Sequence, residues 1–260
     1  MLEIILCPDR KENTRRLLTR ICAEAVRGKQ ILVTPEQFSH AAERELCRMG
    51  GDSISRYAEV LSFSRLASRV FSIEGGAADT ETDAGGRLLM MSLAVEQVRS
   101  RLKIFGSAAA KPEFLLRLLD TLEEFRSFCV TPAALRAAAV ELGGALAVKT
   151  EEFALLMESY AGVCEHCGQN PETKLNRLLS ALETSDFAQG KTFYFDGFTD
   201  FNGIQREILA QLLASGAEVK VSLTCNSLEH PGQQYETAQE TARQLLALAA
   251  PQGIRTRCMQ

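Results

Sequence analysis

The sequence predicts an α/β protein in which a parallel sheet with flanking helices is interrupted by a large helical insertion. Three times within the first 76 residues, a short β-branched or aliphatic run leads into an amphipathic helical pattern. That repetition is typical of parallel strands joined by right-handed crossovers. Near Thr80 the hydrophobic period becomes purely helical, and near Thr192 strand-like runs return. We therefore expect one sheet built from both ends of the chain.

Composition indicates a globular protein with a substantial core. The 260 residues are 46% hydrophobic and 24% charged, with a formal net charge of −4. This charge disfavours a protein that binds nucleic acid through a broad basic face. No apolar run approaches the ~20 residues that a membrane-spanning helix needs, so no membrane segment is predicted. The N-terminal run Leu2–Leu6 contains Glu3 and follows no basic segment, so we expect no secretory signal and a cytoplasmic location.

The eight cysteines and three histidines predict neither a disulfide framework nor a metal site. The cysteines are scattered over the chain in apolar contexts, as reduced cysteines are. Cys164 and Cys167 have ligand-like spacing, but a zinc site needs four ligands and no second pair exists. His40, His166 and His230 are more typical of solvated or structural histidines than of catalytic ones. We expect no metal ligands and no catalytic residues.

The elements of the predicted sheet follow from hydrophobic runs and helix stop signals. Strands are expected at residues 2–6, 30–33, 59–61, 192–195, 218–223 and 254–258, with amphipathic helices after each of the first four. Residues 80–188 have helical periodicity, with proline at the expected first turns of two helices. The predicted organisation is therefore a P-loop NTPase-like α/β domain made of residues 1–79 and 189–260, with a helical subdomain at 80–188.

Two segments at the ends of predicted strands decide whether this sheet can use a nucleotide. A phosphate-binding loop needs glycines, then Lys and Ser or Thr, so that backbone N–H groups can close on phosphate oxygens. The junction after Leu6 has no glycine, and Lys11 is not followed by a hydroxyl residue. After the strand at 192–195, Asp196 and Asp200 form a degenerate Walker B motif. Gly197 takes the place of the glutamate that polarises the attacking water in motor ATPases.

The order of these motifs resembles the N-terminal helicase-like domain of the B subunit of AddAB-type (RexAB-type) helicase-nucleases. The most specific segments are Ser62-Phe-Ser-Arg-Leu66 and Asp196-Gly-Phe-Thr-Asp200, and the resemblance covers nearly the whole chain. More remotely, the chain is similar to the first motor domain of UvrD/Rep-like helicases, whose Asp-Glu-Phe-Gln-Asp motif corresponds to residues 196–200.

The resemblance implies part of an ATP-dependent enzyme that processes double-strand breaks for recombinational repair. It implies an A subunit that uses ATP and Mg²⁺, and contact with single-stranded and double-stranded DNA. It also implies that this chain is the N-terminal part of a longer protein whose iron–sulfur cluster lies in a C-terminal domain. In the family, this domain is associated with scanning the single strand for the Chi recombination signal.

The predicted DNA contacts lie at the carboxyl ends of the strands. Single strands are held by aromatic stacking together with arginine or amide contacts. The resemblance to the AddAB-type family implies that Gln37, Phe63 and Arg65 match positions implicated in recognition of the DNA strand. It implies that Phe198 or Phe201 joins them. The alternative is that Phe198 and Phe201 simply pack under the edge of the sheet and that Phe63 belongs to the core. Ser68 occupies a position at which relatives often have an aromatic residue, which weakens the stacking surface.

Two other functions remain open from the sequence. The chain could be a nucleotide-binding ATPase in its own right, or a protein-interaction module without a DNA role. The glycine-free first loop and Gly197 argue against the first of these. The motif order argues against the second.

Overall fold

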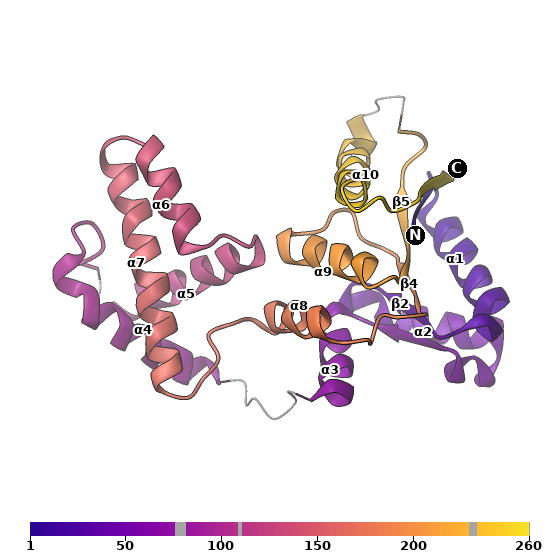
Figure 1. Cartoon of the computed structure of the whole chain (residues 1–260), viewed down its shortest axis with the longest axis horizontal. Coiled ribbons are helices and arrows are strands. Elements are labelled where there is room, and N and C mark those ends of the chain that lie inside the picture. The colour runs from indigo at the N-terminus through magenta and orange to yellow at the C-terminus, as the bar shows by residue number, and fades with distance from the viewer. Residues whose placement is uncertain (76–81, 109–110, 229–232, 260) are drawn as a thin grey trace. The chain divides into compact units, whose positions relative to one another are not determined.

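The computed structural model describes residues 1–75, 82–108, 111–228 and 233–259. They divide into two compact units, one made of Met1–Gly75 with Arg177–Gln260 and the other of Gly76–Asn176. The first is an α/β unit and the second is helical (Figure 1). Within the described residues, no helix has the length and apolar character to span a membrane.

The α/β unit contains one parallel sheet, which confirms the predicted fold class. In the described part of the chain the sheet has six strands in the order β3-β2-β4-β5-β1-β6, and every neighbouring pair is parallel. The strands are β1 (Leu2–Cys7), β2 (Gln30–Val33), β3 (Ala58–Leu61), β4 (Thr192–Phe195), β5 (Glu218–Thr224) and β6 (Thr256–Met259). The central strands are buried along their length, as the continuous apolar runs in the sequence predict.

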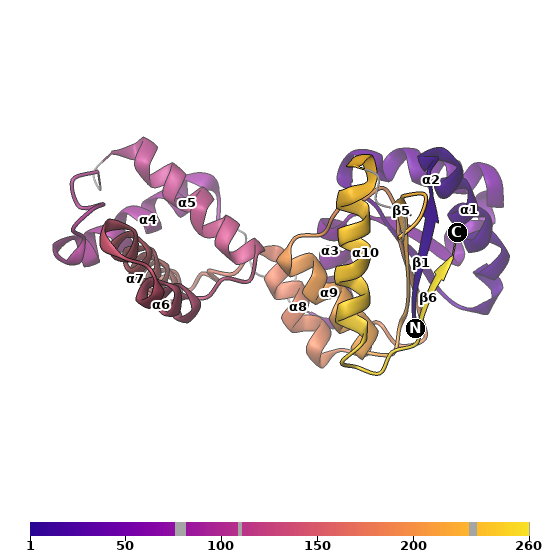
Figure 2. The same ribbon diagram turned by 90° about the horizontal axis from the view of Figure 1, so that it is seen from above.

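Helices cover both faces of this sheet, so its apolar side chains are removed from water on both sides. Figure 2 shows α1 (Arg10–Glu24) on one side of the strands, and α9 (Gly203–Ala214) and α10 (Glu236–Ala249) on the other. The remaining helices of this unit are α2 (Glu36–Gly50), α3 (Phe63–Glu74) and most of α8 (Lys174–Thr184). Leucine and isoleucine side chains of α1 and α2 pack against β2 and β3 in one buried cluster.

A buried charged network joins three strands to α1. The parallel register sets Glu3, Lys220 and Tyr194 in one row across β1, β5 and β4. Lys220 Nζ lies 2.6 Å from Glu24 Oε2, and the Tyr194 hydroxyl donates to the same oxygen at 2.8 Å. Arg20 bridges Glu24 and Glu3, at 3.0 and 2.9 Å. Ionic groups in a low-dielectric interior are stable only when paired in this way.

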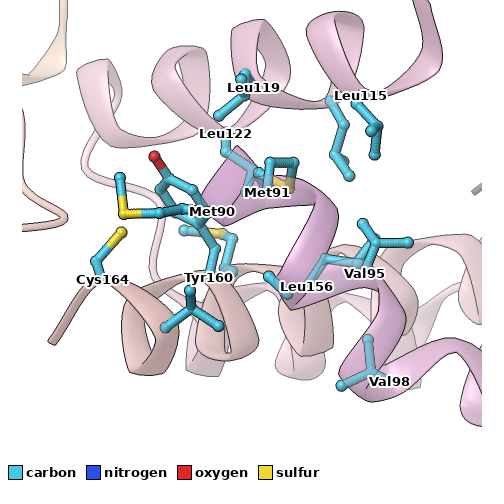
Figure 3. Packing of buried hydrophobic residues seen from close by; sticks show 14 of the residues in the cluster. Met90, Met91, Val95, Val98, Leu115, Leu119, Leu122, Leu156, Tyr160 and Cys164 are labelled. Carbon is cyan, nitrogen blue, oxygen red and sulfur yellow. The ribbon is translucent and has the colours of Figure 1, made fainter. Parts of the chain in front are cut away.

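The helical unit has its own apolar core. Its helices are α4 (Ala84–Val98), α5 (Pro112–Ser127), α6 (Pro132–Glu141) and α7 (Gly144–His166). Figure 3 shows Met90 and Met91 of α4 beside Leu122 of α5 and Tyr160 of α7, all buried in one cluster. This core comes from a helical hydrophobic period that the sequence displays clearly.

A buried carboxylate organises the chain after α4. Glu152 of α7 is 4% exposed, and its oxygens accept the backbone N–H groups of Lys103, Ile104 and Phe105 at 2.5–3.3 Å. These amides lie in a non-helical turn, where they would otherwise lack partners. Glu152 therefore satisfies the backbone polar groups of that turn.

The second boundary between the units lies earlier in the chain than residue 188. Leu178 and Leu182 of α8 are buried, and Gln211 of α9 donates to the Leu182 carbonyl at 3.3 Å. The guanidinium of Arg177 lies 4.9 Å from the ring centre of Phe71 in α3. Most of α8 consequently belongs to the α/β unit, although its hydrophobic period is the same as that of the helices before it.

Candidate nucleic-acid interface

The carboxyl ends of the parallel strands meet along one edge of the sheet, which we call the carboxyl edge. It is formed by the residues that follow β1, β2, β3, β4 and β5, and all the sequence-predicted site residues lie in these segments. Ligands of open α/β sheets bind at such an edge, because the loops there all project to the same side.

Asp196 follows β4 and is buried, with both carboxylate oxygens engaged. Oδ2 accepts from the Thr14 hydroxyl at 2.7 Å, and Oδ1 accepts from the Ser222 hydroxyl of β5. Its backbone N–H donates to the Val33 carbonyl of β2 at 3.0 Å. Asp196 therefore connects α1, β2 and β5 through hydrogen bonds.

The segment after β1 is too short to form a phosphate-binding loop. Only Pro8 and Asp9 separate β1 from α1, and the Asp9 carboxylate caps the helix. It accepts from the backbone N–H groups of Lys11 and Glu12 at 2.8 and 3.4 Å. Those N–H groups are the ones a nucleotide phosphate would use at a helix N-terminus. A carboxylate of the chain already occupies those N–H groups, so they are not available to a nucleotide phosphate.

Thr14 is not apparent as a site residue from the sequence when Lys11 is aligned with the Walker lysine, because Glu12 then takes the hydroxyl position. If Thr14, which bonds the Walker B aspartate, is taken as the motif's hydroxyl residue, the spacing G-x-x-x-x-G-K-[ST] assigns Asn13 to the lysine position. Cys7 and Glu12 then take the two glycine positions. Asn13 is buried, and its side-chain N–H₂ donates to the Leu223 carbonyl at 3.1 Å. Thr14 is therefore a sequence signal for this site, because it supplies the Ser or Thr with which the motif ends.

Four phenylalanines pack together at the carboxyl edge. The ring centre of Phe63 lies 5.7 Å from that of Phe195 and 5.5 Å from that of Phe198. The rings of Phe198 and Phe201 are stacked, with their centres 4.9 Å apart. Phe63 is 6% exposed and Phe201 is 2% exposed, whereas Phe198 is partly exposed. Phe198 is therefore the ring of this aromatic cluster that is most accessible to solvent, and it packs against Phe63 and Phe201.

Two polar residues expected at the interface are exposed in the first turns of helices. Gln37 follows β2 in α2, and Arg65 follows β3 in α3, where its backbone N–H donates to the Ser62 side chain that caps the helix. Ser68 is also exposed on α3, and Asp200 is exposed in the loop after β4. Amide, guanidinium and aromatic groups together can hold a single strand by hydrogen bonding and stacking.

Across the described ranges, no group of three or more His, Cys, Asp or Glu side chains could hold a metal ion. Cys164 is buried in α7 and Cys167 is exposed just beyond its end. Burial raises the pKa of the Cys164 thiol, which favours the protonated form over a metal-binding thiolate.

A parallel sheet with helices on both faces, an aspartate at the end of β4 and a strand-to-helix turn after β1 define an α/β domain whose arrangement is consistent with the P-loop-like type. The chain belongs to the AddB N-terminal family, whose model, described as "ADDB, N-terminal", matches residues 5–259.

Similar proteins are named as the B subunit of an ATP-dependent helicase/deoxyribonuclease. The chain is 31% identical over 248 residues to that of Caldanaerobacter subterraneus subsp. tengcongensis, covering 91% of this chain and 21% of the relative. It is 32% identical over 255 residues to that of Pelotomaculum thermopropionicum, covering 91% and 22%. The protein of Clostridioides difficile is 26% identical over 265 residues, covering 98% and 23%. The chain thus spans about a fifth of the length of these relatives.

Proposed function

We propose that this chain is a catalytically silent, helicase-like domain that binds single-stranded DNA at its carboxyl edge. The main support is the set of side chains that lie at that edge. Gln37 and Arg65 are exposed there and Phe198 is partly exposed, whereas Asp9 fills the place of the nucleotide phosphates. The edge thus retains groups for a nucleic-acid strand but has lost those that hold a nucleotide.

The proposed setting is the B subunit of an ATP-dependent helicase and deoxyribonuclease that acts in recombinational repair of double-strand breaks. The names of the relatives support this setting. In it, the domain scaffolds an A subunit that uses ATP and Mg²⁺ on double-stranded DNA in the cytoplasm. The domain then reads the emerging single strand for a Chi-type signal. An iron–sulfur cluster would belong to another part of such a protein.

Replacing Arg65 with alanine should weaken binding of a fluorescent single-stranded oligodeoxythymidine, measured by anisotropy over a series of salt concentrations. Arg65 would neutralise one phosphate, so the slope of log affinity against log salt should fall by about one. Arg56→Ala is the matched control, because Arg56 is exposed before β3, away from the carboxyl edge. Equal effects of the two substitutions would reduce the interaction to nonspecific charge attraction.

Mg·ATP should neither be hydrolysed nor raise the melting temperature of the protein. A ligand that binds only the folded state adds about 2.7 kcal/mol of stability at a hundredfold excess over its dissociation constant. The Asp9 cap predicts no such gain, and the absence of a glutamate at position 197 predicts no hydrolysis. Melting curves with increasing Mg·ATP provide the measurement. A saturable shift would favour the alternative function of a nucleotide-binding ATPase.

A protein-interaction module without a DNA role is the remaining alternative. It predicts that neither Arg65→Ala nor Phe198→Ala changes oligonucleotide binding, because binding would be absent in the unmodified protein. The exposed guanidinium and amide groups beside a partly exposed aromatic ring favour the DNA-binding function over this one.

A further inference from the structure

Arg10 is a carboxyl-edge residue that the motif comparison did not single out. It is the first residue of α1, and its guanidinium carbon lies 4.1 Å from the centre of the Phe38 ring in α2. Arg10 is exposed, whereas Phe38 is partly buried. The contact joins the segments that follow β1 and β2. Stacking of this kind fixes the plane of a guanidinium group and leaves its N–H donors available.

Gly197 leaves the space that this pair occupies. A Cβ atom at residue 197 would lie 3.2 Å from Arg10 Nη2 and 3.5 Å from Phe38 Cδ2, and the backbone φ there is +82°. A side chain would therefore press on the guanidinium and strain the backbone. The position that holds a water-polarising glutamate in motor ATPases is here kept empty, and an arginine lies against it.

The carboxylates near Arg10 have hydrogen-bond or ion-pair partners other than Arg10. Asp9 accepts backbone N–H groups of α1, Glu12 pairs with Arg15 and Arg16, and Asp196 accepts two hydroxyl groups. Within the ranges that the structure describes, Arg10 makes no ion pair. An exposed arginine with its plane fixed and no carboxylate partner is suited to an external anion.

We propose that Arg10, stacked on Phe38 beside Gly197, binds a backbone phosphate of single-stranded DNA. The inference rests on the proposed function and adds a contact from the residue that begins α1. A strand that contacts Gln37, Arg65 and Phe198 crosses the ends of β2, β3 and β4, and the Arg10 guanidinium lies against residues that follow β2 and β4. A guanidinium can donate two parallel hydrogen bonds to one phosphate, and its prior stacking reduces the side-chain entropy lost on binding.

The test compares Arg10→Ala, Arg10→Lys and Phe38→Leu with the unmodified protein and with Arg56→Ala. The probe is the fluorescent oligodeoxythymidine, titrated over a salt series. Arg10→Ala should weaken binding roughly 5–10-fold and lower the salt slope by about one. Arg10→Lys removes the paired guanidinium donors and Phe38→Leu removes the ring under the guanidinium, so each should weaken binding. Both variants keep the positive charge, so the salt slope should stay unchanged. Arg56→Ala should leave binding close to that of the unmodified protein.

Other outcomes would overturn the inference in distinguishable ways. Unchanged affinity and slope in Arg10→Ala, with a lowered melting temperature, would make the pair a packing contact only. A saturable melting shift with Mg·ATP that Arg10→Ala abolishes would assign the arginine to a nucleotide phosphate instead. If Arg65→Ala weakens binding and Arg10→Ala does not, this inference fails while the proposed function survives. If the unmodified protein does not bind the oligonucleotide, both fail.

Discussion

Replacing Phe63 with alanine is expected to lower the free energy of unfolding of the α/β unit by about 3–5 kcal/mol. Phe63 is 6% exposed and its ring packs against Phe195 and Phe198 at the end of the sheet. Removing the ring leaves a cavity that the surrounding strands and helix can fill only in part. The loss would also deprive Phe198 of its support, so oligonucleotide affinity should fall as an indirect effect.

The matched variant is Phe198→Ala, which removes a partly exposed ring from the same cluster. It should remove a stacking contact of about 1–3 kcal/mol from DNA binding with a smaller loss of stability. Urea unfolding followed by circular dichroism gives the stability, and anisotropy gives the affinity. A stable Phe63→Ala protein with greatly weakened binding would instead assign the base-stacking role to Phe63.

Replacing Glu24 with glutamine is expected to destabilise the α/β unit by about 3–5 kcal/mol at neutral pH. The substitution keeps the shape of the side chain but removes the charge that faces Lys220, whose side chain is 2% exposed on β5. It also weakens the acceptor for Tyr194 and Arg20. A buried ammonium group without a full counter-charge is strongly unfavourable.

The same residue predicts a loss of stability in acid. Burial by itself raises the pKa of Glu24, but hydrogen bonds from Lys220, Tyr194 and Arg20 outweigh it and hold the pKa at about 2. Because the folded-state pKa is below the ordinary value of 4.5, the stabilisation is present above pH 4.5. It is lost as pH falls from about 4.5 to about 2. The stability gap between the unmodified protein and Glu24→Gln should narrow over that interval.

Two comparisons separate the buried network from a general charge effect. Glu12→Gln removes a partly exposed carboxylate from the same helix, where it pairs with Arg15 and Arg16, and should change stability little. Lys220→Met added to Glu24→Gln should recover part of the lost stability, because it removes a buried charge whose remaining ion-pair contact is the longer one to Glu218, at 3.8 Å. A double variant no more stable than the single one would show that packing at this site matters more than charge.

Much of the sheet could be predicted because its strands are signalled locally. The runs at Gln30–Val33 and Thr192–Phe195 are apolar or aromatic over their whole length, and the structure has strands with those bounds. Strand ends were less well defined: β6 covers Thr256–Met259 rather than residues 254–258. Backbone hydrogen bonding to β1 sets its register, and hydrophobicity does not report such bonding.

The sequence by itself determined the alternation of strands and helices, the helical character of the insertion, and the absence of glycine and glutamate at the two motif positions. Each depends on residue type and local spacing. Only the tertiary structure decided that Phe63 and Phe201 are buried while Phe198 is partly exposed. Only it joined Thr14 to Asp196, which are 182 positions apart, and set Arg10 against Gly197. Side-chain exposure and partnership depend on which distant segments the fold brings together, and local periodicity carries no information about those pairings.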